Sequence, residues 1–347
     1  MGFQIRLTPG GQTFTAEKDE ILLDAALRQG IQMPHGCRDG ACGACRGKVL
    51  QGAFDPGRQS FALSETDRAA GFALLCQAKA QGDLLIESRE ARQEREPVLK
   101  TLPVRVERLT RLSPEVMRLE LRLPGEEVLE YRPGQYIDIL LKDGRRRAFS
   151  LATAHQTGGL LELHVRHVPG GVFTGHVFSS LRERDILRIR GPYGQFGMSR
   201  ERTRPALLVA GGTGFAPLKA IVEQALQEGL QQALWLYWGG RRREDIYLHD
   251  LAEQWARDNP LLTFVPVLSN AEDDPGWHGR RGLVHRAVMD DHPDMSGYEA
   301  YVCGPPPLVA AARRDFSEIC HLPTTAYHAD PFELSSDAPS APSSSSG

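Results

Sequence analysis

The order of hydrophobic and polar positions changes character twice along the chain. Up to Glu87, short alternating segments and one helical stretch are separated by turns. From residue 102 to about 197, short β-branched or apolar segments alternate with glycine and proline turns, which is typical of an antiparallel barrel. After Pro205, apolar strands alternate with helical segments, which predicts a parallel α/β sheet. These patterns predict a multidomain protein.

The first pattern begins with two alternating segments around Pro9-Gly10-Gly11, which predict a β-hairpin. A helix is expected over residues 21–29, with Asp19 or Asp24 as its N-cap and Gly30 at its end. Further along, the expected strands are residues 102–109, 116–123, 135–141, 160–168, 185–190, 206–210, 233–237, 262–266 and 299–303, with a helix at 217–228.

Domain boundaries follow from the changes of pattern. Residues 88–97 are charged without apolar periodicity, which predicts a solvated linker. We therefore expect a first domain at 1–90, a linker at 91–100, a barrel at 101–200 and an α/β domain at 201–330. The tail at 335–347 is rich in Ser, Pro and Ala and is expected to be disordered.

Length, composition and charge agree with this organisation. A chain of 347 residues exceeds what one hydrophobic core usually supports, and 41% apolar with 24% charged residues is typical of a globular protein. A net charge of −3 gives no reason to expect nucleic acid or an anionic membrane as a partner. No apolar run is long enough to span a bilayer, and no signal peptide is recognised, so the expected compartment is the cytoplasm.

Four of the six cysteines indicate a metal site. Cys37, Cys42 and Cys45 have the spacing C-x4-C-x2-C, and Cys76 follows further on, which is the plant-type [2Fe–2S] pattern. Interleaved glycines and alanines let backbone N–H groups approach the sulfurs. Zinc is the alternative, but it would favour paired C-x2-C knuckles. Buried structural cysteines are the second alternative, and they seldom cluster with interleaved glycines.

Residues 1 to about 90 resemble the ferredoxin family on these motifs, and the resemblance implies a β-grasp fold with Cys37, Cys42, Cys45 and Cys76 as cluster ligands. Charged residues balance nearly evenly over this region. That balance weakly favours electron delivery within the chain over steered diffusion of a separate ferredoxin.

A second set of motifs follows in the predicted barrel. Arg145-Arg146-Arg147-Ala148-Phe149-Ser150 alone could be an exposed basic turn. It is followed by His164-Val165-Arg166, Gly170-Gly171-Val172-Phe173-Thr174 and Gly191-Pro192-Tyr193-Gly194. In this order and spacing, residues 102 to about 330 resemble the ferredoxin–NADP reductase superfamily, whose barrel binds FAD or FMN.

The resemblance implies roles for particular residues. Arg147 would pair with the flavin phosphate, Phe149 would lie against the isoalloxazine where relatives more often have Tyr, and Ser150 would donate towards N5. The ribityl and pyrophosphate groups would contact Val165, Gly171, Val172 and Thr174. FAD is expected rather than FMN, because FMN-containing reductases of the phthalate dioxygenase type carry the ferredoxin at the C-terminus.

Two glycine-containing turns indicate a nicotinamide site. Gly211-Gly212-Thr213-Gly214 connects a predicted strand to a helix, where N–H groups and the helix dipole can hold a pyrophosphate. It is not the G-x-G-x-x-G fingerprint. Cys303-Gly304-Pro305 follows another strand. In the same superfamily this motif closes the nicotinamide pocket and places the thiol near the transferring carbon, although a buried free cysteine is more often simply a small hydrophobe.

The sequence leaves two interpretations open for the choice of coenzyme and for the role of Phe332 near the end of the fold. Arg241-Arg242-Arg243 could hold the 2′-phosphate of NADPH or form a solvated turn, since Glu244 and Asp245 follow. Similar turns occur in NADH-preferring relatives, so NADH is slightly favoured. Phe332 occupies the place where relatives put an aromatic residue on the flavin, and an exposed tail is the alternative.

Together these features predict an NAD(P)H-dependent oxidoreductase that passes electrons through a flavin to a [2Fe–2S] cluster. Hydride transfer delivers two electrons at once and the cluster accepts one, so a flavin is needed between them. The motifs look closest to CDP-6-deoxy-3,4-glucoseen reductase, and phenol hydroxylase reductase shares the module order. The acceptor is therefore a sugar dehydratase or an oxygenase component. A stand-alone flavin or ferric reductase and a non-catalytic redox carrier or sensor are the alternatives.

Overall fold

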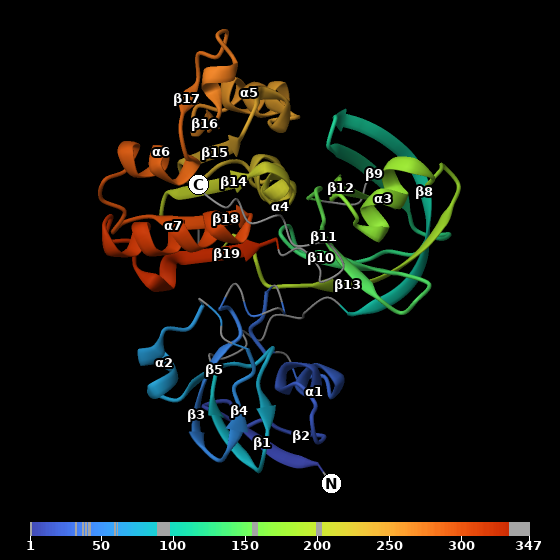
Figure 1. Ribbon diagram of the computed structural model, residues 1–347, viewed down its shortest axis with the longest axis vertical. Coiled ribbons are helices and arrows are strands. Elements are labelled where there is room, and N and C mark those ends of the chain that lie inside the picture. The colour runs from blue at the N-terminus through green and yellow to red at the C-terminus, as the bar shows by residue number, and fades with distance from the viewer. Residues whose placement is uncertain are drawn as a thin grey trace, which may run out of the picture. The chain divides into compact units, whose positions relative to one another are not determined.

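The computed structural model describes residues 2–31, 33–36, 38, 40, 43–58, 60, 62–88, 98–154, 159–198 and 203–332. The chain forms two compact units, an N-terminal one and one that contains the barrel and the α/β domain (Figure 1). Most of the linker predicted at 91–100 and the whole tail at 335–347 lie outside the described residues. Lys100, expected at the end of the linker, already belongs to the first barrel strand.

The N-terminal unit is a β-grasp fold. Its five-stranded sheet has the order β2-β1-β7-β3-β5, in which β1 and β7 are parallel and the other pairs antiparallel. Alternate residues such as Ile5 and Leu7 enter a core shared with the helix α1. The elements are β1 (Phe3–Thr8), β2 (Thr13–Ala16), α1 (Leu22–Arg28), β3 (Arg46–Gln51), β4 (Phe54–Asp55), α2 (Glu65–Ala69), β5 (Phe72–Leu74), β6 (Lys79–Ala80) and β7 (Leu84–Glu87).

The predicted N-cap of α1 is wrong. The cap position is Ile21, with no side-chain hydrogen bond, and neither Asp19 nor Asp24 takes that role. The first free N–H groups of the helix instead donate to backbone carbonyls of the segment before β6, Leu22 to Ala78 and Leu23 to Leu75. Tertiary hydrogen bonds thus replace a capping side chain.

The second unit begins with an antiparallel barrel of strand order β11-β10-β13-β8-β9-β12. An isolated bridge between Leu151 and Leu163 connects the two end strands. The hydrophobic pattern predicts neither β11 nor α3, because β11 begins with two arginines and α3 contains Gly175 and β-branched residues. The elements are β8 (Lys100–Ser113), β9 (Val116–Arg122), β10 (Tyr136–Leu140), β11 (Arg146–Ser150), β12 (Leu160–Arg166), α3 (Val172–Ser179) and β13 (Ile186–Tyr193).

The α/β domain has a six-stranded sheet of order β17-β16-β15-β14-β18-β19, parallel from β17 to β18. Figure 1 shows α4 on one face and α6 and α7 on the other. Residues such as Leu208 and Ala210 pack with α4 in one core cluster. The elements are β14 (Ala206–Gly211), α4 (Phe215–Gln227), β15 (Leu234–Gly240), α5 (His249–Asp258), β16 (Leu262–Leu268), β17 (Arg280–Arg281), α6 (Val284–Asp291), β18 (Glu299–Gly304), α7 (Pro306–Glu318) and β19 (Tyr327–Pro331).

Within the described part of the chain, no helix combines the length and the apolar character that crossing a bilayer requires.

Candidate functional site

The predicted cluster loop brings two cysteines together. Cys45 lies just before β3 and Cys76 just after β5, and the antiparallel pairing of these strands places the Sγ atoms 3.2 Å apart. That separation exceeds the roughly 2.0 Å of a disulfide and suits two ligands of one metal atom. Both side chains are buried. Cys37 and Cys42 lie outside the described residues.

The backbone of this loop has the conformation that an anionic cluster requires. Arg38, Gly40 and Gly43 all have positive φ, at 65°, 85° and 74°. A Cβ on Gly40 would lie 2.2 Å from Nε2 of the Gln77 side chain, and the positive φ of Gly40 would strain any larger residue there. Left-handed residues interspersed in such a loop turn successive N–H groups inward and form the concave nests seen at iron–sulfur sites. The donor set and the loop therefore fit a [2Fe–2S] cluster.

The predicted flavin strand β11 runs antiparallel to β10, with Ser150 opposite Tyr136 and Arg147 opposite Ile139. Arg147 and Phe149 share one face of the strand and Ser150, which is buried, lies on the other. Burial and the neighbouring Arg145 hold the pKa of the Arg147 guanidinium below its ordinary value. A negative group placed there would be stabilised by that cation, which fits a flavin phosphate.

The start of α3 lies beside this strand, because the rings of Phe149 and Phe173 are 5.3 Å apart. Gly171 is the N-cap of α3 and makes no side-chain cap, so the helix N-terminus can receive an anion. A Cβ on Gly171 would lie 2.6 Å from the Thr174 hydroxyl. That hydroxyl donates to the Val168 carbonyl at 3.2 Å, so Thr174 stabilises the turn.

Two other predicted flavin residues differ in exposure. Val172 is 48% exposed and available to a ligand. Val165 is fully buried in the barrel core, so only its backbone could reach the flavin.

The two predicted nicotinamide turns pack backbone against backbone. A Cβ on Gly214 would lie 2.1 Å from the Cys303 carbonyl oxygen, and one on Gly304 would lie 2.8 Å from the Gly211 carbonyl oxygen. Gly212, by contrast, has a φ of +54° and open space where its Cβ would be. The glycine set therefore has two functions, close packing at Gly211, Gly214 and Gly304 and an open cradle at Gly212, which fits a dinucleotide pyrophosphate.

The remaining predicted residues surround these turns. Cys303 is fully buried at the end of β18, where it pairs with Ala210 of β14. Thr213 is 9% exposed, and Pro305 is the N-cap residue of α7. Phe332 donates its backbone N–H to the Gly304 carbonyl at 2.8 Å and packs against the core of the α/β domain.

A buried polar cluster between the barrel and the α/β domain was not predicted as part of the site. Its members are Glu162, His164, Lys219, Glu223 and Tyr247. One signal was available in the sequence, a lysine inside the apolar helical run that begins at Phe215. A charged residue at such a position has to find a buried partner.

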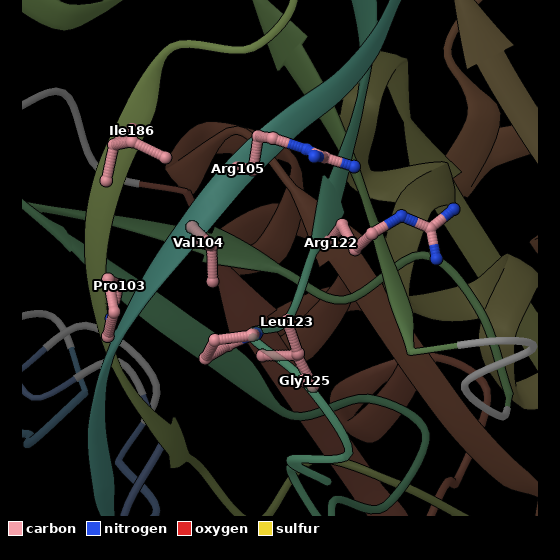
Figure 2. A pocket seen from close by; sticks show the side chains of 8 residues that line it. Pro103, Val104, Arg105, Arg122, Leu123, Gly125 and Ile186 are labelled. Atoms are coloured by element: carbon pink, nitrogen blue, oxygen red, sulfur yellow. The ribbon is translucent and has the colours of Figure 1, made fainter.

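A surface hollow on the barrel is not the flavin site. Figure 2 shows that its lining includes Arg105 and Arg122, and no residue predicted to bind flavin lines it. These two arginines donate to Glu107 and lower the pKa of that carboxyl to about 2. The hollow is lined by Pro103, Val104, Arg105, Arg122, Leu123, Pro124, Gly125 and Ile186.

Comparison with known proteins gives matches to three family models in chain order. Residues 5–81 match a 2Fe-2S iron-sulfur cluster binding domain, residues 103–198 an oxidoreductase FAD-binding domain, and residues 208–314 an oxidoreductase NAD-binding domain.

Some relatives are similar over nearly the whole length of this chain and of their own. The chain is 38% identical over 316 residues to the CDP-6-deoxy-L-threo-D-glycero-4-hexulose-3-dehydrase reductase of Yersinia pestis, covering 91% of this chain and 94% of the relative. It is 35% identical over 322 residues to the reductase component of phenol 2-monooxygenase of Pseudomonas sp. strain CF600, covering 90% and 89%. The crystal structure of Amycolatopsis cytochrome P450 reductase is similar, with a TM-score of 0.78, 33% identity and coverage of 95% and 98%.

Replacing Cys45 by Ser is expected to abolish the iron–sulfur cluster, because one of two adjacent buried sulfurs is lost. Iron content per chain, measured by metal analysis after anaerobic reconstitution, should fall to near zero, while NADH should still reduce the flavin. Cys320→Ser is the matched control, since Cys320 is also buried but belongs to the other unit. Full iron content in Cys45→Ser would contradict the assignment.

Replacing Gly214 by Ala is expected to lower the free energy of unfolding of the α/β domain by about 1–3 kcal/mol, since the new Cβ would displace the Cys303 carbonyl. Urea titration followed by tryptophan fluorescence reports on this domain, because Trp235, Trp238, Trp255 and Trp277 all lie in it. Gly297→Ala, where the Cβ would meet open space, should leave the midpoint nearly unchanged. Equal midpoints for the two variants would show that the turns are not interlocked.

Proposed function

The chain belongs to the ferredoxin–NAD(P)H reductase superfamily, in the group with an N-terminal plant-type [2Fe–2S] domain, and from this membership we propose that its electron acceptor is a dehydratase acting on a nucleotide-linked deoxysugar. As a member it is an NAD(P)H-dependent oxidoreductase that passes electrons from NAD(P)H to FAD, then to the [2Fe–2S] cluster and on to an electron-acceptor partner. FAD takes up the pair of electrons of a hydride and releases them singly.

The residues of the chain hold and orient these groups. We propose that Cys37, Cys42, Cys45 and Cys76 bind the two irons, with N–H groups of the loop directed at the sulfurs. Thiolate ligands of this kind suit a reducing compartment, and we propose the cytoplasm.

In the barrel, Arg147 and the N-terminus of α3 at Gly171 would bind the flavin phosphates. Both offer positive charge to an anion, the first through its guanidinium and the second through N–H groups and the helix dipole. Val165, Val172 and Thr174 would border the ribityl chain. Phe149 would lie against the ring and Ser150 would donate a hydrogen bond towards N5.

In the α/β domain, the turn Gly211–Gly214 would hold the coenzyme pyrophosphate, with Gly212 as the point of closest approach. Cys303, Gly304 and Pro305 would close the nicotinamide pocket from the neighbouring strand. Phe332, held through its N–H by Gly304, would cover the flavin ring and yield to the nicotinamide. In this proposal the hydride donor and the acceptor would lie on two domains of one unit.

We propose NADH as the preferred coenzyme. Arg241 lies 3.4 Å from Glu115 and 3.9 Å from Asp245, and Arg243 donates to Asp274 at 2.8 Å. A 2′-phosphate would have to compete with these carboxylates for the two arginines. Arg241 and Arg243 would therefore attract a 2′-phosphate less strongly than three consecutive arginines in the sequence suggest.

The single observation that supports the dehydratase as acceptor is the 38% identity over nearly the whole length of a hexulose-3-dehydrase reductase. The oxygenase component of an aromatic hydroxylase is the second candidate, favoured by the relative of the phenol 2-monooxygenase system at 35% identity. Both classes accept electrons from a reductase component. A stand-alone flavin reductase would not require the N-terminal domain.

The coenzyme proposal predicts that anaerobic NADH bleaches the flavin with a kcat/KM at least about tenfold above that of NADPH, because a tenfold preference corresponds to about 1.4 kcal/mol, less than one charge-assisted hydrogen bond. Stopped-flow absorbance of flavin and cluster gives both rates. A preference for NADPH would overturn the proposal.

The acceptor proposal predicts that this chain supports NADH-dependent turnover by the Yersinia pestis hexulose-3-dehydrase on its CDP-linked sugar. Product is measured by chromatography, with the Cys45→Ser variant as the control that should support none. A parallel reaction supplies the phenol 2-monooxygenase oxygenase and phenol. Turnover of phenol alone would assign the acceptor to the oxygenase class.

A further inference from the structure

A chain of buried polar contacts links the barrel to the α/β domain. The Tyr247 hydroxyl lies 2.9 Å from Nδ1 of His164, and Nε2 of the same ring lies 2.8 Å from Oε1 of Glu162. The His164 side chain is completely covered. Tyr247 belongs to the α/β domain and the other two residues belong to β12, so these contacts cross from one domain to the other.

Lys219 of α4 makes a second set of contacts across the same boundary. Its Nζ donates to the Ala152 carbonyl at 2.9 Å and to Oε1 of Glu223 at 2.7 Å, and lies 3.3 Å from Oε1 of Glu162. The other oxygen of Glu223 accepts the N–H of Ala154 at 3.2 Å. Lys219 and Glu223 of α4 therefore contact both Glu162 of β12 and the segment that follows β11.

Two groups of this cluster have pKa values below their ordinary ones. Burial alone would raise the pKa of Glu162, but the hydrogen bond from His164 and the charge of Lys219 outweigh it and hold the pKa at about 2. Burial lowers the pKa of His164, so the ring is neutral near pH 7. Buried ion clusters of this kind contribute little net stability, and their best-attested use is to specify one arrangement over others.

On the barrel side, the contacts end next to Ser150. Ala152 and Ala154, which bind Lys219 and Glu223, lie two and four residues after Ser150 in the chain. The bridge between Leu151 and Leu163 also puts Ser150 and His164 at the next register position, on the outer face of the barrel. The proposed N5 donor is thus placed by residues that contact the α/β domain.

On the coenzyme side, the contacts end at the phosphate turn. The ring of Tyr247 meets Trp238 edge to face at 5.0 Å, and Nε1 of Trp238 donates to the Gly212 carbonyl at 2.9 Å. The helix that carries Lys219 starts at Phe215, immediately after the same turn. Both routes from the barrel therefore reach the proposed pyrophosphate cradle.

We propose that the interdomain chain, defined as Glu162, His164, Lys219, Glu223 and Tyr247, sets the position of the Gly212 turn relative to Ser150 and thereby the approach of the nicotinamide to the flavin. These are positioning residues, since none of them touches the reacting atoms. The inference rests on the proposed placement of coenzyme and flavin. The step it serves is transfer of hydride from nicotinamide C4 to flavin N5, which oxidises the coenzyme and reduces the flavin without a further reactant. Such a step is sensitive to displacements of about 1 Å.

The test compares two tyrosines that differ in what their hydroxyl groups connect. Tyr247→Phe removes the hydrogen bond across the domain boundary. Tyr237→Phe removes bonds to Asp291 and His292, at 2.9 and 3.1 Å, that lie within the α/β domain. Three measurements are made on holoprotein: flavin bleaching by NADH in a single turnover, the dissociation constant of NAD+ from the flavin difference spectrum, and the melting temperature.

Tyr247→Phe should slow single-turnover bleaching about tenfold or more, while the NAD+ dissociation constant stays within about twofold of wild type. Tyr237→Phe should lower the melting temperature similarly and bleach at the wild-type rate. Lys219→Met, which breaks the second route, should also slow bleaching without weakening NAD+; if it fails to fold, the tyrosine pair still decides.

Equal bleaching rates for the two tyrosine variants would overturn the inference and make the interdomain chain a structural feature only. An equal loss of NAD+ affinity and rate would also overturn it, because the defect would then be in binding. If wild type and Tyr237→Phe are not bleached by NADH at all, the proposed coenzyme or its placement fails, and the same experiment distinguishes this outcome from a defect confined to Tyr247→Phe.

Discussion

The backbone contact between the turns after β14 and β18 is the constraint on which the coenzyme site depends. Parallel neighbouring strands bring Gly211–Gly214 and Cys303-Gly304 to the same edge of the sheet. The turns come so close that a single added carbon at Gly214 would overlap the Cys303 carbonyl. The Cys303 side chain is buried in the core of the same domain, whereas a Cβ at Gly212 would meet open space. The cradle that we propose for the pyrophosphate would thus be formed by a lack of side chains rather than by a set of binding groups.

The barrel and the α/β domain are joined by a different kind of interaction. Their boundary contains a lysine, two carboxylates, a neutral histidine and a tyrosine, all with assigned partners. An apolar boundary could slide, whereas a hydrogen-bonded one has few alternative registers. A reaction between two rings held on separate domains depends on the distance between them, so one preferred geometry at the boundary matters more for the reaction than additional stability.

The sequence predicted the elements with strong periodicity and the motifs with unusual composition. The strands from Ala206 onwards, the helix after Gly214 and the fold class are confirmed. Among the missed elements, β11 begins with two arginines and α3 contains Gly175 and β-branched residues, so the hydrophobic pattern of each is weak. The N-cap at Asp19 or Asp24 was wrong because tertiary carbonyls satisfy the helix, and such contacts are not visible in local sequence.

Some residues of the candidate site could be named from the sequence and others could not, for similar physical reasons. Spacing of cysteines and glycines is local, so the cluster loop and the two glycine turns could be named as candidates from the sequence. The partners of Lys219 come from β12 and the segment after β11, far away along the chain. Only the folded barrel brings them together. Sequence alone could say that a lysine in an apolar helix is unusual, and not what it binds.

The crowding of positive charge at Arg145 and Arg147 has a consequence for how the protein behaves in dilute solution. Burial disfavours the charged form of Arg147 most, the neighbouring Arg145 adds to this, and Asp143 offsets only part of it. FAD would remove this penalty, so it would act as a stabilising ligand as well as a redox group. Its contribution would grow with the logarithm of its free concentration, reaching about 2.7 kcal/mol at a hundred times the dissociation constant. Loss of FAD on dilution or gel filtration would then lower the free energy of unfolding of the barrel as well as remove the protein's colour.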